Sequence, residues 1–298
     1  MPSPAKSLSD VPGDQPLDAL RSLLAQEQSG GAPWYWLLDQ SALPQRGWLR
    51  RHVDRAQWVD VLSGKSETAF NGATPVLVRA TGATAGAATT ASFVGELHRV
   101  GRFANAVSLL SSALSIDDLQ TALCERSRID LPGNLEAVLR YFDTRTLPLL
   151  PQLLTPSQYS AFTRDIQRWV YLDRWGAVQC LPTATLLRGE PLPAPIRLKL
   201  DDAQEAMLID DGLTDAVIDL MLTQRHTALL DRSPPEQFDT IDPLVRAARS
   251  AELTEPFEAL AYAATALAEG VDFSQREPWL SQLQQYREKR CSLEEAFA

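Results

Sequence analysis

The sequence predicts an α+β fold, a mixed α/β N-terminal lobe, for the first part of the chain and a second, all-α C-terminal lobe for the rest. Three observations lead to this prediction. Up to about residue 181, short apolar runs rich in β-branched and aromatic residues alternate with helical patterns. Four prolines then fall between residues 182 and 195. After them the apolar residues recur at a spacing of about 3.6, which is typical of amphipathic helices.

The domain boundaries follow from the same changes in composition. Residues 1–16 are rich in Pro and Ser and are expected to be a disordered tail. Residues 17–185 are predicted to form the mixed α/β lobe, residues 186–200 a Pro-rich linker, and residues 201–298 the helical lobe. A chain of 298 residues suits two domains of ordinary size. Because no apolar run reaches the roughly 18 residues of a membrane helix, we expect no membrane insertion.

The elements of the mixed lobe are predicted from local patterns. In order, these are a helix at 17–28, strands at 34–39, 57–62 and 75–80, a small-residue loop at 81–90, a helix at 92–100, a strand at 105–111, and a helix that Ser115 caps. The segment 138–170 is predicted to begin as a strand through Phe142. It is expected to continue as a helix with Asp143 as its N-cap, and then as a second helix capped by Thr155 with Gln158 completing a capping box. A hairpin over 168–181 closes the lobe.

The helical lobe is divided by proline and glycine. Helices are predicted over 202–225 and 241–250, with a break at Pro234 and Pro235. Thr254 is expected to cap a third helix, which Gly270 ends and which includes Phe257 in its apolar stripe. The last helix carries a stripe of three apolar or aromatic residues, namely Trp279, Leu283 and Tyr286.

Charge and reactive residues limit the possible functions. The formal net charge is −10, and residues 196–298 contain 10 basic and 20 acidic residues. An acidic chain disfavours nucleic acid as a partner. The cysteines are three and scattered, which argues for a reducing cytoplasm and against a disulfide or zinc framework. None of the three histidines (His52, His98 and His226) lies in a catalytic or metal-binding motif, so we expect no enzyme activity, no metal and no cofactor.

One motif in the mixed lobe resembles a known family. It reads Arg140-Tyr141-Phe142-Asp143-Thr144-Arg145-Thr146-Leu147 and is followed by Leu153, Thr155, Gln158, Phe162 and Trp169. Together with Trp36-Leu37-Leu38-Asp39, which is similar to the usual first strand, it resembles the type VI secretion effector-chaperone family over about residues 33–185. Thr144 stands where the family often has Pro. A second motif, with Gly270, Asp272, Phe273, Pro278 and Trp279, resembles a helical segment often found at the C-terminal end of such adaptors, over roughly residues 236–290.

The resemblance implies a non-enzymatic cytoplasmic chaperone or adaptor. Such a protein binds a cognate secreted effector and loads it onto a spike protein of the VgrG/PAAR type before secretion. Two alternatives remain open at this point: a hydrolase-type enzyme with a scattered active site, and a structural subunit associated with the secretion baseplate.

Five residues are candidates for contact with a partner: Trp48, Arg140, Tyr141, Asp143 and Arg145. The structural interpretation of Asp143 as an N-cap is favoured, and Arg140 and Arg145 either pair with it or offer bidentate donors to a bound chain. Trp48, beside two arginines, is the surface candidate among the tryptophans. We expect apolar contacts of the first lobe to supply affinity and the acidic lobe to speed association with a basic partner.

Overall fold

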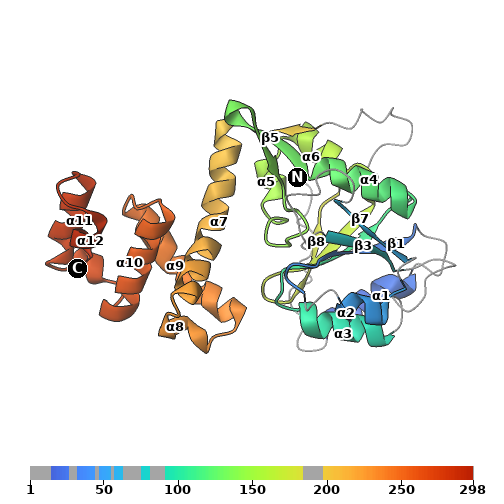
Figure 1. The fold of residues 1–298 in the computed structure, drawn as a ribbon, viewed down its shortest axis with the longest axis horizontal. Helices are drawn as coiled ribbons and strands as arrows, with labels where there is room; N and C mark the ends of the chain where they lie inside the picture. The colour runs from blue at the N-terminus through green and yellow to red at the C-terminus, as the bar shows by residue number, and fades with distance from the viewer. Residues whose placement is uncertain are drawn as a thin grey trace, which may run out of the picture. The chain divides into compact units, whose positions relative to one another are not determined.

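The computed structural model describes residues 15–26, 32–43, 47–54, 57–62, 75–80, 91–183 and 197–297. They divide into two units, residues 1–205 and 206–298, which are treated separately below. Figure 1 shows the fold. The predicted loop at 81–90, most of the predicted tail, and residues 186–196 of the predicted linker lie outside the described residues.

A six-stranded sheet, here called sheet A, organises the first unit. Its strands are β1 (Trp34–Asp39), β2 (Trp58–Asp60), β3 (Pro75–Arg79), β4 (Val107–Ser111), β7 (Arg168–Leu172) and β8 (Val178–Leu181). The order is β2-β3-β1-β4-β7-β8, and every neighbouring pair is antiparallel. All six residues of β1 are buried, as expected for a strand that is covered on both faces.

Helices cover both faces of sheet A. Because successive side chains of a strand point to opposite faces, neighbouring residues pack against different helices. Figure 1 shows α1 (Gln15–Gln26), α2 (Gly47–His52) and α3 (Ala91–Gly101) on one side, and α4 (Ile116–Arg126), α5 (Leu150–Leu153) and α6 (Pro156–Thr163) on the other. Trp36 belongs to the cluster with α2 and α3 and lies edge-on to Phe93 at 6.4 Å between ring centroids. Trp169 meets the opposite layer, where it stacks on Phe162 at 5.7 Å. These apolar layers supply most of the stabilising burial.

A second, three-stranded sheet extends the first unit. It contains β5 (Arg128–Leu131), β6 (Leu135–Val138) and β9 (Leu198–Lys199), in the order β6-β5-β9. Gly133, at φ 73°, turns the chain between β5 and β6. Arg197 bridges the sheet through Asp130 and Glu136, each at 2.7 Å. The last residues of the predicted linker therefore pair as a strand in this sheet.

The strand predicted through Phe142 is wrong, and so is the helix predicted directly after Asp143. The last strand residue is Val138, and residues 139–149 form a chain of turns before the four-residue α5. Tyr141 and Phe142 are buried, at 0% and 2% exposure. An apolar run predicts burial more surely than it predicts a strand, because a packed turn buries the same side chains.

Helix α6 begins as the sequence predicts. The Thr155 hydroxyl accepts a hydrogen bond from the backbone nitrogen of Gln158 at 3.3 Å. In return, Gln158 Oε1 accepts from the backbone nitrogen of Thr155 at 2.9 Å. The capping box is thereby confirmed. Gln158 also donates to the Lys199 carbonyl at 2.6 Å, and Gln204 Nε2 donates to Gln158 Oε1 at 2.9 Å and to the Leu153 carbonyl at 2.6 Å. This cap thus ties together three parts of the first unit.

Replacing Thr155 by alanine should lower the free energy of unfolding by about 1 kcal/mol, because an amide at the start of α6 loses its acceptor. Urea denaturation followed by circular dichroism measures the change. Thr155→Ser keeps the hydroxyl and should stay close to the wild type. Equal stability of the alanine and serine variants would show that the cap contributes nothing.

The described residues of the second unit form helices joined by turns and contain no strand, so the predicted fold class is confirmed. It contains most of α7 (Asp202–Thr223), then α8 (Thr227–Leu230), α9 (Pro234–Ser250), α10 (Pro256–Glu269), α11 (Trp279–Arg287) and α12 (Leu293–Ala296). Its core is continuous through α7, α9 and α10, with Val217, Met221, Ile241 and Ala263 nearly inaccessible. Between residues 197 and 297 the longest strand is β9, with two residues.

Three details of the helical lobe differ from the prediction. Helix α9 begins at Pro234 rather than being broken there, because Pro fits the first turn of a helix and Ser233 completes a capping box. The N-cap of α10 is Glu255, one residue after the predicted Thr254. Phe257 is 62% exposed, since the buried face of α10 runs through Leu260 and Ala263 instead.

Candidate functional site

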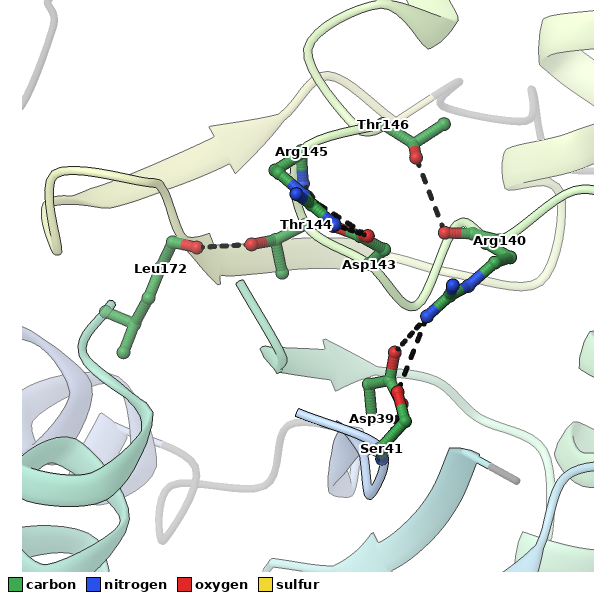
Figure 2. Close-up of polar contacts among 8 residues, drawn as sticks. All are labelled: Asp39, Ser41, Arg140, Asp143, Thr144, Arg145, Thr146 and Leu172. Carbon is green, nitrogen blue, oxygen red and sulfur yellow. Dashed lines mark hydrogen bonds and ion pairs between the residues drawn. The ribbon is translucent and has the colours of Figure 1, made fainter. Parts of the chain in front are cut away.

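The turns at 139–149 lie across one end of sheet A, where β1 and β7 finish and β4 begins. Two hydrogen bonds of Thr144 hold them there. Its nitrogen donates to the Asn105 carbonyl at 2.8 Å, before β4, and its hydroxyl donates to the Leu172 carbonyl at 2.7 Å, at the end of β7. The segment that carries the recognised motif is therefore fixed just before β4 and at the end of β7 by backbone acceptors. Figure 2 shows the bond from Thr144 to Leu172.

Asp39 and Arg140, 101 residues apart in the sequence, form an ion pair at this end of the sheet. Arg140 Nη2 lies 3.0 Å from Asp39 Oδ2, as Figure 2 shows. Asp39 Oδ1 accepts from the nitrogen and the hydroxyl of Ser41 at 2.9 and 2.6 Å. The carboxylate is buried, whereas 53% of the Arg140 side chain is exposed. The Arg140 guanidinium also lies 5.6 Å from the centre of the Phe142 ring.

Asp143 pairs with Arg145 and is not a helix N-cap. Arg145 Nε and Nη2 lie 2.9 and 2.6 Å from the two carboxylate oxygens, a two-pronged contact that matches the geometry of guanidinium and carboxylate. Asp143 Oδ1 also accepts from the Arg145 nitrogen at 3.1 Å, which closes a turn. The predicted cap is wrong because no helix follows within reach: α5 begins at Leu150. Of the two predicted ion pairs with Asp143, the structure contains the one with Arg145, while Arg140 pairs with Asp39 instead.

Two of the candidate contact residues are buried. Trp48 is 4% exposed and stacks on Phe93 at 5.9 Å, so its predicted surface position is wrong. The adjacent arginines point to solvent, and the tryptophan takes the inward face of the short helix α2. Tyr141 is inaccessible, and its hydroxyl donates to the Leu123 carbonyl at 2.7 Å. Arg140 and Arg145 are thus the candidates with accessible side chains.

The described residues offer little that resembles a catalytic centre. No group of three or more His, Cys, Asp or Glu side chains within the described ranges could hold a metal ion. Burial raises the pKa of the Cys180 thiol, which disfavours a nucleophilic thiolate. Among the described residues, no helix combines the length and the apolar composition needed to cross a bilayer. What the site presents is a pair of arginines, each held by an aspartate.

Two features were missed from the sequence, one at the site and one at the opposite end of β4, where the Ser112 hydroxyl donates to the Asp165 carbonyl. Asp39 was identified only as the end of the first strand. A buried carboxylate at the end of a strand nevertheless indicates that a basic or hydrogen-bonding side chain lies nearby. The buried pair Arg126–Asp165, with 2.5 Å between Arg126 Nη2 and Asp165 Oδ2, left no local signal.

Comparison with protein families gives one match. Residues 34–161 match the family described as "Domain of unknown function (DUF4123)". The match begins at the first residue of β1 and ends within α6, so the DUF4123 segment contains both Asp39 and the motif around Arg140. The second unit lies outside it. Neither the comparison with curated proteins nor the comparison with solved structures gives a match.

Replacing Asp39 by alanine should lower the free energy of unfolding by about 2–3 kcal/mol, since Arg140 and Ser41 lose a buried charged acceptor. Asp39→Asn keeps an acceptor oxygen for Ser41 and should lose roughly half as much. Thermal denaturation of both variants provides the measurement. If alanine and asparagine were equally harmless, the Asp39–Arg140 pair would not stabilise the first unit.

Proposed function

We propose that this protein is a non-enzymatic cytoplasmic adaptor, which binds a cognate type VI secretion effector and loads it onto a spike protein of the VgrG/PAAR type. The observation that carries the proposal is the match of residues 34–161 to DUF4123, a family associated with type VI effector adaptors. The part of the motif from Arg140 to Gln158, which suggested the same role from the sequence, falls within this segment. Phe162 and Trp169 follow it.

The geometry of the DUF4123 segment supports an adaptor. Its two arginine–aspartate pairs hold turns onto a rigid sheet and leave guanidinium groups accessible. Arginine on a rigid support is suited to protein recognition, because little side-chain freedom remains to be lost on binding. Protein recognition requires no cofactor and no turnover.

A secretion assay tests the proposal. In a strain that lacks this chain, the effector encoded beside it should still be made but should disappear from the secreted fraction, while other effectors of the apparatus are still secreted. The intact chain supplied from a plasmid should restore secretion. Purified chain and effector should also co-elute on size exclusion. Normal secretion without the chain would contradict the adaptor role, and loss of all secretion would instead favour a structural subunit of the apparatus.

A further inference from the structure

The end of sheet A that carries Arg140 is more cationic on its surface than the chain as a whole. Four segments meet there: 39–43, 102–106, 139–149 and 172–178. Together they contain four arginines and three aspartates, in a chain whose formal net charge is −10. We call this region the arginine end.

The aspartates of the arginine end face inward. Asp39, Asp143 and Asp173 are 1%, 8% and 9% exposed. Each has donors on its oxygens: Asp173 accepts from the nitrogens of Trp175 and Ala177 at 3.0 and 2.8 Å and from Gln179 Nε2 at 2.9 Å. The carboxylates are thus buried and bonded within the protein. The side chains of Arg140 and Arg145, in contrast, remain 53% and 32% exposed.

An aromatic side chain lies at the same end of the sheet. Trp175, in the turn between β7 and β8, is 49% exposed, whereas Trp34, Trp36, Trp48, Trp58 and Trp169 are buried. Arg102 packs against Gly176, the residue after Trp175. The contact is so close that a Cβ at position 176 would lie 2.5 Å from Arg102 Cγ. Gly176, at φ 77°, is needed both for this turn and for this contact. Arg102 therefore packs against the turn that carries Trp175.

From this arrangement we propose that the arginine end binds an acidic segment of the effector, with carboxylates on Arg140 and Arg145 and an adjacent apolar side chain on Trp175. Charge complementarity selects the occupant, because the accessible arginine side chains attract a carboxylate. Tryptophan and arginine are also enriched among the residues that dominate binding energy. The inference rests on the proposed function, since it names the class of segment that the adaptor recognises.

A peptide assay with the full chain tests the inference without the effector. The probe is a fluorescein-labelled peptide of alternating Glu and Leu residues, and the control peptide has Lys in place of Glu. Anisotropy should show binding of the Glu peptide that Arg140→Glu and Trp175→Ala each weaken at least about tenfold, as expected for residues of this type at a binding centre. Arg99→Ala is the matched control, because Arg99 is an exposed, ion-paired arginine of the same unit, 69% exposed, and lies on α3. It should bind the Glu peptide as the wild type does.

Trp175→Ala keeps the test decisive if Arg140→Glu disturbs folding, since half of the Trp175 side chain is already in solvent. Unchanged affinity in a folded Trp175→Ala or Arg140→Glu variant would overturn the inference, as would preference for the Lys peptide. A dimer in analytical ultracentrifugation that Arg140→Glu dissociates would also overturn it, in favour of a second copy as the occupant.

The effector itself separates this inference from the proposed function. If the wild type binds the effector and folded Arg140→Glu and Trp175→Ala variants bind it equally well, the adaptor role stands and the arginine end is not its recognition surface. If the wild type does not bind the effector at all, the proposed function falls, and the peptide assay still decides whether the arginine end recognises acidic segments.

Discussion

Replacing Tyr141 by alanine should lower the free energy of unfolding of the first unit by about 3–5 kcal/mol, the usual range when a large buried aromatic side chain is removed. The Tyr141 ring lies edge-on to Phe142, Phe162 and Trp169, with 5.6–5.8 Å between centroids. Burial also raises the pKa of its hydroxyl above the ordinary value for tyrosine. Urea denaturation measures the loss.

Tyr141→Phe is the control for this prediction. It keeps the three ring contacts and removes only the hydrogen bond to the Leu123 carbonyl, so about 1–3 kcal/mol should be lost. Tyr141 was a candidate for partner contact, but its side chain is buried. Effector binding by the alanine variant should therefore decline only as its folded fraction declines. A folded, fully stable Tyr141→Ala protein would contradict this account of the packing.

Replacing Asp165 by alanine should have a similarly large effect, about 3–5 kcal/mol, because it leaves a buried cation without its counter-charge. Arg126 is 8% exposed, and burial lowers its pKa despite the neighbouring carboxylate. Arg164 Nε lies 3.6 Å from the same carboxylate, so a second arginine also loses this neighbour. Chemical denaturation again measures the change.

The matched control for Asp165 removes both charges. In the double variant Arg126→Met, Asp165→Leu no charge of the pair stays buried, and much of the stability lost in Asp165→Ala should return. If the double variant is as unstable as Asp165→Ala, the loss comes from packing and not from the uncompensated arginine.

Local signals made much of the fold predictable. The capping box at Thr155 lies within four residues, and the hairpin of β7 and β8 within fourteen, so each element is determined by its own neighbourhood. The 3.6 spacing of the second unit has the same property, because each helix presents its apolar face regardless of what covers it.

The candidate site was less predictable because its partners are distant in the sequence. Nothing near Arg140 indicates that it pairs with Asp39, and nothing near Thr144 indicates that Asn105 and Leu172 accept its hydrogen bonds. Residues 139–142 resemble a strand in composition, yet they lie in turns. Local bonds, such as Asp143 nitrogen to the Arg140 carbonyl, and the distant partners of Thr144 together satisfy the backbone there. Trp48 shows the same limit: the nearby Arg50 and Arg51 suggested a surface residue. Its burial depends on Phe93, which lies on another helix.

The contacts of Gln204 determine where the first unit can be cut from the rest of the chain. Gln204 lies in the first turn of α7, yet its side chain completes the hydrogen bonds of Leu153 and Gln158. A fragment that stops at residue 200, where the composition changes, would lack both hydrogen bonds. The Leu153 carbonyl would then lose the donor that Gln204 supplies. A fragment meant for crystallisation or binding studies should therefore extend through residue 205, and should carry the beginning of a helix that the second unit continues.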